Sequence, residues 1–400
     1  MLYRLAICVF LCGLPAASAE QDALAISAGI QARHLPFGTI LDPVFDPSGN
    51  VAGYSRCGDS AIWTGHYLAA EAFRYQVTRD PSALSNALTA LRGIKGLVDT
   101  TGNNSLARCY IPEDSPYAEG ILREEAHHGA YKGRCLERDC RWVGNTSRDQ
   151  YAGVFFGLGV AWEMIGDPGV RSVISDLVTR MLNRLLDDNW AVIMPDGGVS
   201  TVFWFRPDQK LNLLAIGAKI NPDRFSSKYR WSRFFEGNLT ATPVLPEVAD
   251  PHGSYFKFNL DALTFYHLVR WEGNRTYHRY YEDAYKILRR TIDGHGNAHF
   301  NMIDRAIEGP DARRDEETRT LLDQWLQRPR RDEYIDLRGI YAACGEDRAC
   351  DPIPVPRRVR TDFLWQRSPF LLYGGGDGRI ETAGIDYILP YWMARFHGVL

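Results

Sequence analysis

The chain has 400 residues, a formal net charge of −3 and 45% hydrophobic residues, which is enough apolar material for one large core. A charge this close to neutral excludes the strongly basic surface with which proteins bind nucleic acids or anionic membranes. Aromatic residues make up 12% of the chain, so they are available both for the core and for surfaces that bind flat, partly apolar ligands.

The first residues predict export. Arg4 precedes an apolar run over residues 5–14, and Ala17-Ser18-Ala19 matches an A-x-A cleavage signal. The apolar run is too short to cross a membrane, which requires about 20 residues. We therefore expect a signal peptide over residues 1–19 with cleavage after Ala19, and a secreted or periplasmic protein with no integral membrane segment.

The cysteines that remain after this cleavage are six, and an even number in an exported chain favours disulfides. A zinc site is the alternative, but no Cys-x-x-Cys pattern occurs. Proximity in the sequence assigns two short-range pairs and leaves one long-range pair. The expected bridges are Cys135–Cys140, Cys344–Cys350 and Cys57–Cys109.

Three stretches share one layout, and they begin at Ser60, Ser147 and Ser254. Each runs about twenty residues through apolar and aromatic positions, breaks at a tight polar turn such as Asp80-Pro81, and is followed by a second helical pattern. A repeated helical hairpin cannot bury its apolar face alone, so neighbouring hairpins must stack.

The apolar spacing predicts about twelve helices in six hairpins. Residues 20–56 are expected to be irregular, 101–146 a long cysteine-bearing loop, and 189–206 a short hairpin or extended insertion. The expected helices cover residues 60–79, 82–98, 147–166, 170–187, 209–220, 223–236, 254–272, 277–292, 298–307, 315–327, 361–373 and 383–396.

The first helix of each pair is the more apolar one, whereas the second carries charged residues on one face. This asymmetry is typical of an all-α (α/α)6 toroid, whose inner helices pack on both sides. An open α-solenoid is the alternative, but the terminal pair is not visibly more polar, as a cap would be. We expect a single toroid domain over residues 57–400.

With its repeated hairpins and its acidic and aromatic helix starts, the chain over residues 57–396 resembles the six-hairpin glycosidase superfamily of carbohydrate-active enzymes. The resemblance implies the (α/α)6 fold and a carbohydrate substrate. Enzymes of this fold include glycoside hydrolases with paired carboxylates, polysaccharide lyases and sugar epimerases, and the fold alone does not choose among them.

In such a toroid the first turns of the inner helices surround one end of the barrel, where the helix dipoles favour anions. Asp59 precedes one helix start, and Trp63 follows one turn later. Capping of the helix is the alternative role for Asp59. The second helix start already has a Thr or Ser to cap it, which leaves Asp149 for another task. The neighbours of Asp149 at this start are Arg148, Gln150 and Tyr151.

Further candidates lie at the later helix starts. Lys257, Asn259 and Asp261 lie within an aromatic run, where each polar side chain needs either a water-filled cavity or a polar partner. His295 and His299 are four residues apart, but no HExxH motif occurs, and we expect no metal site. Asp304 sits beside Arg305, so a surface ion pair is its alternative role.

We therefore predict an exported glycoside hydrolase that needs no cofactor, with Asp149 and Asp59 as its leading pair of carboxylates. The alternatives are a polysaccharide lyase acting on a uronate and a non-catalytic glycan-binding or scaffold toroid. The sequence does not predict the oligomeric state. The other candidate carboxylates are Glu381, Asp386 and Asp304, and the expected sugar-binding residues are Trp63, Arg148, Gln150, Tyr151, Lys257, Asn259, Asp261, His299 and Trp365.

Overall fold

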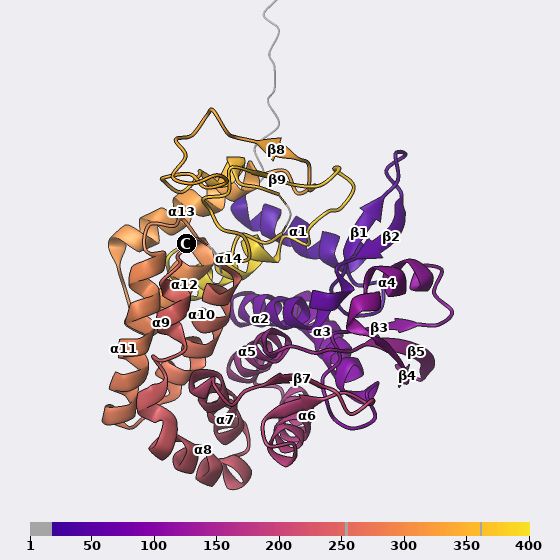
Figure 1. Ribbon diagram of the computed structural model, residues 1–400, viewed down its shortest axis with the longest axis vertical. Helices are drawn as coiled ribbons and strands as arrows, with labels where there is room; N and C mark the ends of the chain where they lie inside the picture. Colours follow the sequence, from indigo (N-terminus) through magenta and orange to yellow (C-terminus); the bar gives the residue numbers. More distant parts are fainter. Residues whose placement is uncertain (1–17, 253–254, 361) are drawn as a thin grey trace, which may run out of the picture.

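The computed structural model describes residues 18–252, 255–360 and 362–400, so almost all of the predicted signal peptide lies outside the described residues. The described part is mainly helical, with 14 α-helices and four small antiparallel sheets (Figure 1). No helix in these ranges is long and apolar enough to cross a membrane.

Six inner helices form a closed ring, because each packs against the next in chain order and the last packs against the first (Figure 1). They are α2 (Ser60–Thr78), α5 (Arg148–Met164), α7 (Pro207–Ile220), α10 (Tyr255–Trp271), α12 (Ala298–Glu308) and α14 (Ile385–Phe396). Five outer helices each follow an inner one and pack against it: α3 (Pro81–Asp99), α6 (Pro168–Asp187), α8 (Pro222–Glu236), α11 (Arg275–Ile292) and α13 (Ala312–Leu326).

The outer partner of α14 is α1 (Ala19–Arg33), which completes the sixth pair and the (α/α)6 toroid. The all-α prediction is confirmed, and the open solenoid is wrong. The expected helix over 361–373 is wrong as well, since residues 362–372 form turns and loop. Residues 20–56 are not irregular: α1 begins with a capping box at Ser18 and Gln21. A hairpin of β1 (Asp42–Phe45) and β2 (Val51–Ser55) follows.

Inner and outer helices differ in burial as their composition predicts. In α2 every residue from Ser60 to Arg74 is buried. In α11, by contrast, the buried residues recur at helical spacing along one face: Tyr281, Ala284, Tyr285, Leu288 and Ile292.

The first two inner helices approach each other backbone to backbone. A Cβ atom on Gly65 of α2 would lie 2.0 Å from the carbonyl oxygen of Gly153 in α5, and one on Gly157 would lie 2.2 Å from the carbonyl oxygen of Gly65. Only glycine permits this separation. It also places the starts of α2 and α5, which carry Asp59 and Asp149, at the same end of the ring.

The segment 101–146 is not a plain loop but folds into a three-stranded sheet ordered β3-β5-β4, with a short helix. Its elements are β3 (Cys109–Pro112), α4 (Ala118–Glu124), β4 (Ala130–Cys135) and β5 (Arg138–Val143). The predicted insertion at 189–206 contains β6 (Ala191–Ile193) and β7 (Val199–Val202), paired as a hairpin. The remaining short elements are α9 (Val244–Val248), β8 (Ile335–Asp336) and β9 (Tyr373–Gly374).

Two of the three expected disulfides are present, Cys57–Cys109 and Cys344–Cys350. The third is not: Cys135 and Cys140 are buried free thiols. They are diagonal neighbours on paired strands, since Cys135 is opposite Arg138 and Cys140 is opposite Gly133, and their thiols are joined by a hydrogen bond rather than a disulfide.

Candidate functional site

A narrow cavity opens at the end of the ring where the inner helices begin. Its walls come from the starts of α2, α5 and α10 and from the loop that precedes α14. The residues that line it are Asp59, Ile62, Trp63, Asp149, Phe256, Asn259, Leu260, Trp365 and Gln366. The structure thus brings both leading carboxylates together with three of the expected sugar-binding residues, Trp63, Asn259 and Trp365.

Asp59 ends a short 3-10 turn (Cys57–Asp59) directly before α2, and its side chain does not cap the helix. The capping interpretation is therefore wrong. Gln150 holds this carboxylate instead, with Nε2 donating to Oδ1 over 3.1 Å. The Oε1 atom of Gln150 accepts the backbone N–H of Ile62 at 3.0 Å, so the buried amide links the starts of α2 and α5.

The pKa of Asp59 is raised to about 6, first because burial disfavours the charged form and second because the negative charge of Asp149 lies nearby. Arg108 opposes this shift, with Nη1 at 3.7 Å from the Asp59 carboxylate. At near-neutral pH Asp59 therefore exchanges its proton readily, which is the property required of a general acid.

Arg108 is the site residue that the sequence analysis missed. Its guanidinium donates to the carbonyl oxygens of Gly58 and Asn145, each at 2.8 Å, and to Ser147 Oγ at 2.7 Å. Ser147 is consequently occupied and does not cap α5 through its side chain. The one signal in the sequence was the Cys57–Cys109 disulfide, which places the residue before Cys109 beside the residues after Cys57.

Asp149 lies in the first turn of α5 and forms no hydrogen bond or ion pair with any residue that the structure describes. Arg148, its neighbour, turns away and donates to the carbonyl oxygen of Val202 at 2.8 Å. The cavity therefore pairs a carboxyl group of raised pKa with an unpaired carboxylate.

Aromatic rings form the floor of the cavity. The ring centroids of Trp63 and Trp365 are 6.3 Å apart, and Trp365 stacks on His66 at 5.0 Å and 22°. A hydrogen bond to α14 holds the loop that carries Trp365, since Asp386 accepts the backbone N–H of Leu364 at 2.9 Å. The two indoles therefore give the polar cavity a buried aromatic floor.

A buried polar chain supports this floor. Asn259 lies between two histidines, with Nδ2 at 3.3 Å from His66 Nε2 and Oδ1 at 3.1 Å from His299 Nε2. Burial lowers the pKa of both imidazoles, that of His66 to about 4, so both are neutral over most of the pH range. His299 is thus buried behind Asn259 rather than exposed in the cavity.

Three candidate carboxylates do not line the cavity, because each serves the fold elsewhere. Glu381 pairs with Arg33 at 3.0 Å; burial raises its pKa, but a hydrogen bond from His34 and the charges of nearby arginines bring the pKa down to about 2. Asp304 pairs with Arg289 at 2.7 Å on the outer side of α12. Asp386 is buried beneath the Trp365 loop, and burial raises its pKa.

Other expected sugar-binding residues also have structural partners. The hydroxyl of Tyr151 is buried and accepts the backbone N–H of Leu106 at 3.1 Å. Asp261 is buried and pairs with Arg206 at 2.6 Å. Lys257 is partly exposed and lies 4.0 Å from Glu247. None of these three lines the cavity.

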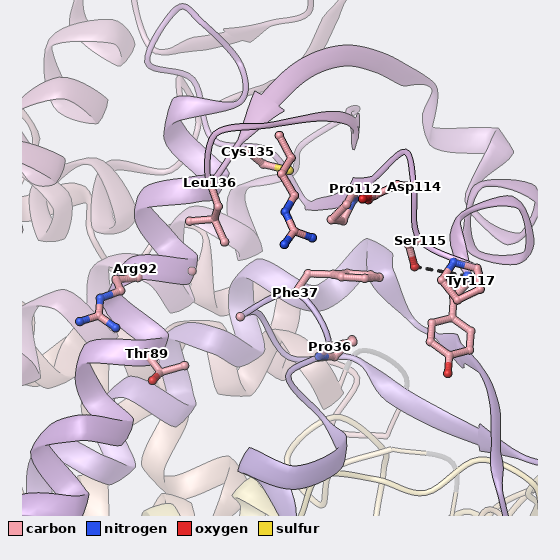
Figure 2. Close-up of a pocket in the computed structure, with 14 residues that line it drawn as sticks. Pro36, Phe37, Thr89, Arg92, Pro112, Asp114, Ser115, Tyr117, Cys135 and Leu136 are labelled. Carbon is pink, nitrogen blue, oxygen red and sulfur yellow. Dashed lines mark hydrogen bonds between the residues drawn. The ribbon is translucent and has the colours of Figure 1, made fainter.

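The carboxylate cavity is small, about 20 Å³, which is room for roughly one water molecule. A much wider cavity of about 580 Å³ lies elsewhere, between the loop at Phe37, α3 and the β4–β5 hairpin (Figure 2). It is lined by Arg92, Asp114 and Tyr117 among others but contains no pair of carboxylates. The narrow cavity is the candidate site on its chemistry, and any ligand larger than a water molecule requires its lining side chains to move.

Comparison with known proteins finds likeness in structure but none in sequence. No protein-family model matches the chain, and no curated protein matches it. A solved structure of cellobiose 2-epimerase from Spirochaeta thermophila is similar over 95% of this chain and 97% of that chain, with 9% sequence identity and a TM-score of 0.45. A likeness this distant does not extend to a reaction or to site residues.

Proposed function

We propose that the protein is an exported glycoside hydrolase in which Asp59 is the general acid and Asp149 is the second carboxylate. The observation that carries the proposal is the raised pKa of Asp59, about 6, beside an Asp149 that has no hydrogen-bond or ion-pair partner among the described residues. Glycoside hydrolysis needs this combination, one carboxyl group that holds a proton and one that is ionised.

In the proposed reaction Asp59 donates its proton to the glycosidic oxygen as the bond to the leaving sugar breaks. Asp149 either removes a proton from the attacking water or attacks the anomeric carbon directly. The cavity that both side chains line has room for about one water molecule, the reactant that either role finally requires. Two residues would orient the reaction: Gln150, by holding Asp59, and Asn259, by its place in the wall.

The aromatic floor supports a sugar as the substrate. Trp63 and Trp365 line the cavity but are buried, and they pack against each other and against Phe363, so they would contact a sugar through the ring atoms that border the cavity. Phe256 is 45% exposed at the rim, where it can stack on a second sugar unit once the cleft opens. We infer that the substrate is a poly- or oligosaccharide and that the protein acts on it outside the cytoplasm.

The proposal is tested by incubating the purified protein with a panel of oligo- and polysaccharides and measuring new reducing ends. Asp59→Asn and Asp149→Asn should each abolish most of the activity, because a general acid or base contributes about 10²–10⁴-fold. Asp176→Asn, at an exposed carboxylate on α6, is the matched control and should retain full activity.

Three outcomes would contradict the proposal. Full activity in both cavity variants would remove these carboxylates from the chemistry. Products with the ultraviolet absorbance of an unsaturated uronate, formed without water, would identify a lyase instead. Binding of a glycan with no turnover in any variant would favour the non-catalytic toroid.

A further inference from the structure

We propose that Glu125, His127 and His128 form a binding site for a divalent transition-metal ion such as Zn²⁺. The three residues lie between α4 and β4, the two histidines in a 3-10 turn (Ala126–His128). Their donor atoms all lie within 4.8 Å of one another, and no other group of three such residues among the described ranges comes as close. The site is separate from the proposed glycoside chemistry and does not depend on it.

Glu125 is buried and its orientation is fixed. One carboxylate oxygen accepts the backbone N–H of Gly58 at 2.7 Å, and the other lies 2.7 Å from His128 Nδ1. Glu125 forms no ion pair with a lysine or arginine in the described structure, so a neutral amide and an imidazole are the groups that meet its charge. The guanidinium of Arg108 lies beyond Gly58, to whose carbonyl oxygen it donates at 2.8 Å, whereas a metal cation bound to the Glu125 carboxylate would neutralise its charge directly.

The histidines offer free donors on the open side. His127 forms no hydrogen bond to a described residue, and its ring centroid is 3.9 Å from that of His128. Both rings face a hollow of about 410 Å³, which Met194 and Asp196 also line. Water can therefore reach the metal position and complete the coordination shell.

The donor set indicates which metals fit. Two imidazoles and one carboxylate suit Zn²⁺, Co²⁺, Ni²⁺ or Cu²⁺, whereas Ca²⁺ and Mg²⁺ prefer shells made only of oxygen. Three protein ligands and an open fourth position are the arrangement of an accessible zinc site. The donors would close to about 2.0–2.2 Å from the ion, and the exposed His127 ring can turn to achieve this.

The site would also tie the α4–β4 segment to the start of α2. Glu125 touches Gly58, and a Cβ atom at Gly58 would lie 2.7 Å from Glu125 Oε2, so glycine is what lets the carboxylate approach. A metal that binds only the folded protein stabilises it in proportion to how far its concentration exceeds Kd. Metal binding therefore has a readout in stability as well as in stoichiometry.

The test uses tag-free, full-length protein that has been treated with a chelator and then titrated with Co²⁺ or Zn²⁺. We expect one equivalent to bind, with visible d–d absorption for Co²⁺ and a rise in Tm of a few degrees. Mg²⁺ and Ca²⁺ should have neither effect. His127→Asn and His128→Asn should each weaken binding at least tenfold, whereas the control His278→Asn, an exposed histidine on α11, should bind as wild type does.

Three results would overturn the assignment. The first is binding of less than one equivalent of metal, and the second is an unchanged metal affinity in both His127→Asn and His128→Asn. The third is a loss of affinity in the His278→Asn control equal to that in the two variants. Melting curves recorded without metal establish that each variant is folded. Glu125→Gln provides a second measurement, since the amide oxygen can still accept from Gly58 while the charge is lost, and it should also weaken metal binding.

Discussion

The close contact between α2 and α5 gives the sharpest prediction about stability. Gly157→Ala adds a Cβ atom that would lie 2.2 Å from the carbonyl oxygen of Gly65 and 2.8 Å from two further backbone atoms of that residue. Real Cβ atoms stay about 3.0 Å or more from such neighbours, and a backbone cannot rotate away as a side chain can. The two helices must therefore separate by nearly 1 Å.

The cost follows from two opposing effects. Overpacking of a core contact destabilises by about 1–3 kcal/mol and occasionally more, and a rigid backbone contact belongs at the upper end. The higher helix propensity of alanine returns about 0.5–1 kcal/mol. We expect Gly157→Ala to lose about 2 kcal/mol in the free energy of unfolding, which for a chain of this size is a fall in Tm of about 2–3 °C.

The assay is denaturant unfolding, followed by circular dichroism, with Gly120→Ala as the matched control. Gly120 lies inside α4, and a Cβ atom there would meet nothing within 4 Å. This variant should be as stable as wild type or more stable by up to about 1 kcal/mol. If Gly157→Ala unfolds at the same denaturant concentration as wild type, the helices are not held as close as described and the reasoning is wrong.

Three further predictions concern the site and its support. With any hydrolysed glycoside, kcat/KM should fall as the pH rises through about 6, because Asp59 then loses the proton that a general acid must donate; a flat profile to pH 8 would contradict this. Arg108→Gln should move this fall in kcat/KM to higher pH, since the arginine charge lowers the pKa of Asp59. A shift of the fall to lower pH would contradict this prediction. Replacing Cys57 and Cys109 together by serine should cost about 2–5 kcal/mol in equilibrium unfolding, because the bridge spans 52 residues, and an unchanged midpoint would contradict that figure.

Much of the helical frame was predictable from local signals. The Asp-Pro turns cap the second helices as their sequence indicates, with Asp80 and Asp167 accepting from the backbone and proline in the first turn. The sixth pair was not predictable in the same way. Its outer helix, α1, comes from the other end of the chain. No local sequence pattern indicates that residues 19–33 pack against α14 and complete the sixth pair.

The lining of the candidate cavity was predictable where helix starts meet and not where distant segments pair. Asp59 and Asp149 belong to first turns of neighbouring inner helices, so the toroid geometry alone placed them together. Glu381 also lies near a helix start, but its partners Arg33 and Arg330 come from remote segments. Sequence spacing does not reveal such ion pairs, and this is why the sequence did not show that Glu381 lies outside the cavity.

The most direct test of the central claim compares leaving groups in the two carboxylate variants. A glycoside whose leaving group is an acidic phenol needs no protonation, whereas an ordinary sugar leaving group does. Asp59→Asn should therefore lose about 10²–10⁴-fold in kcat/KM on the sugar substrate but little on the activated one, while Asp149→Asn should lose activity on both. An equal loss on the two substrates in Asp59→Asn would contradict its assignment as the general acid.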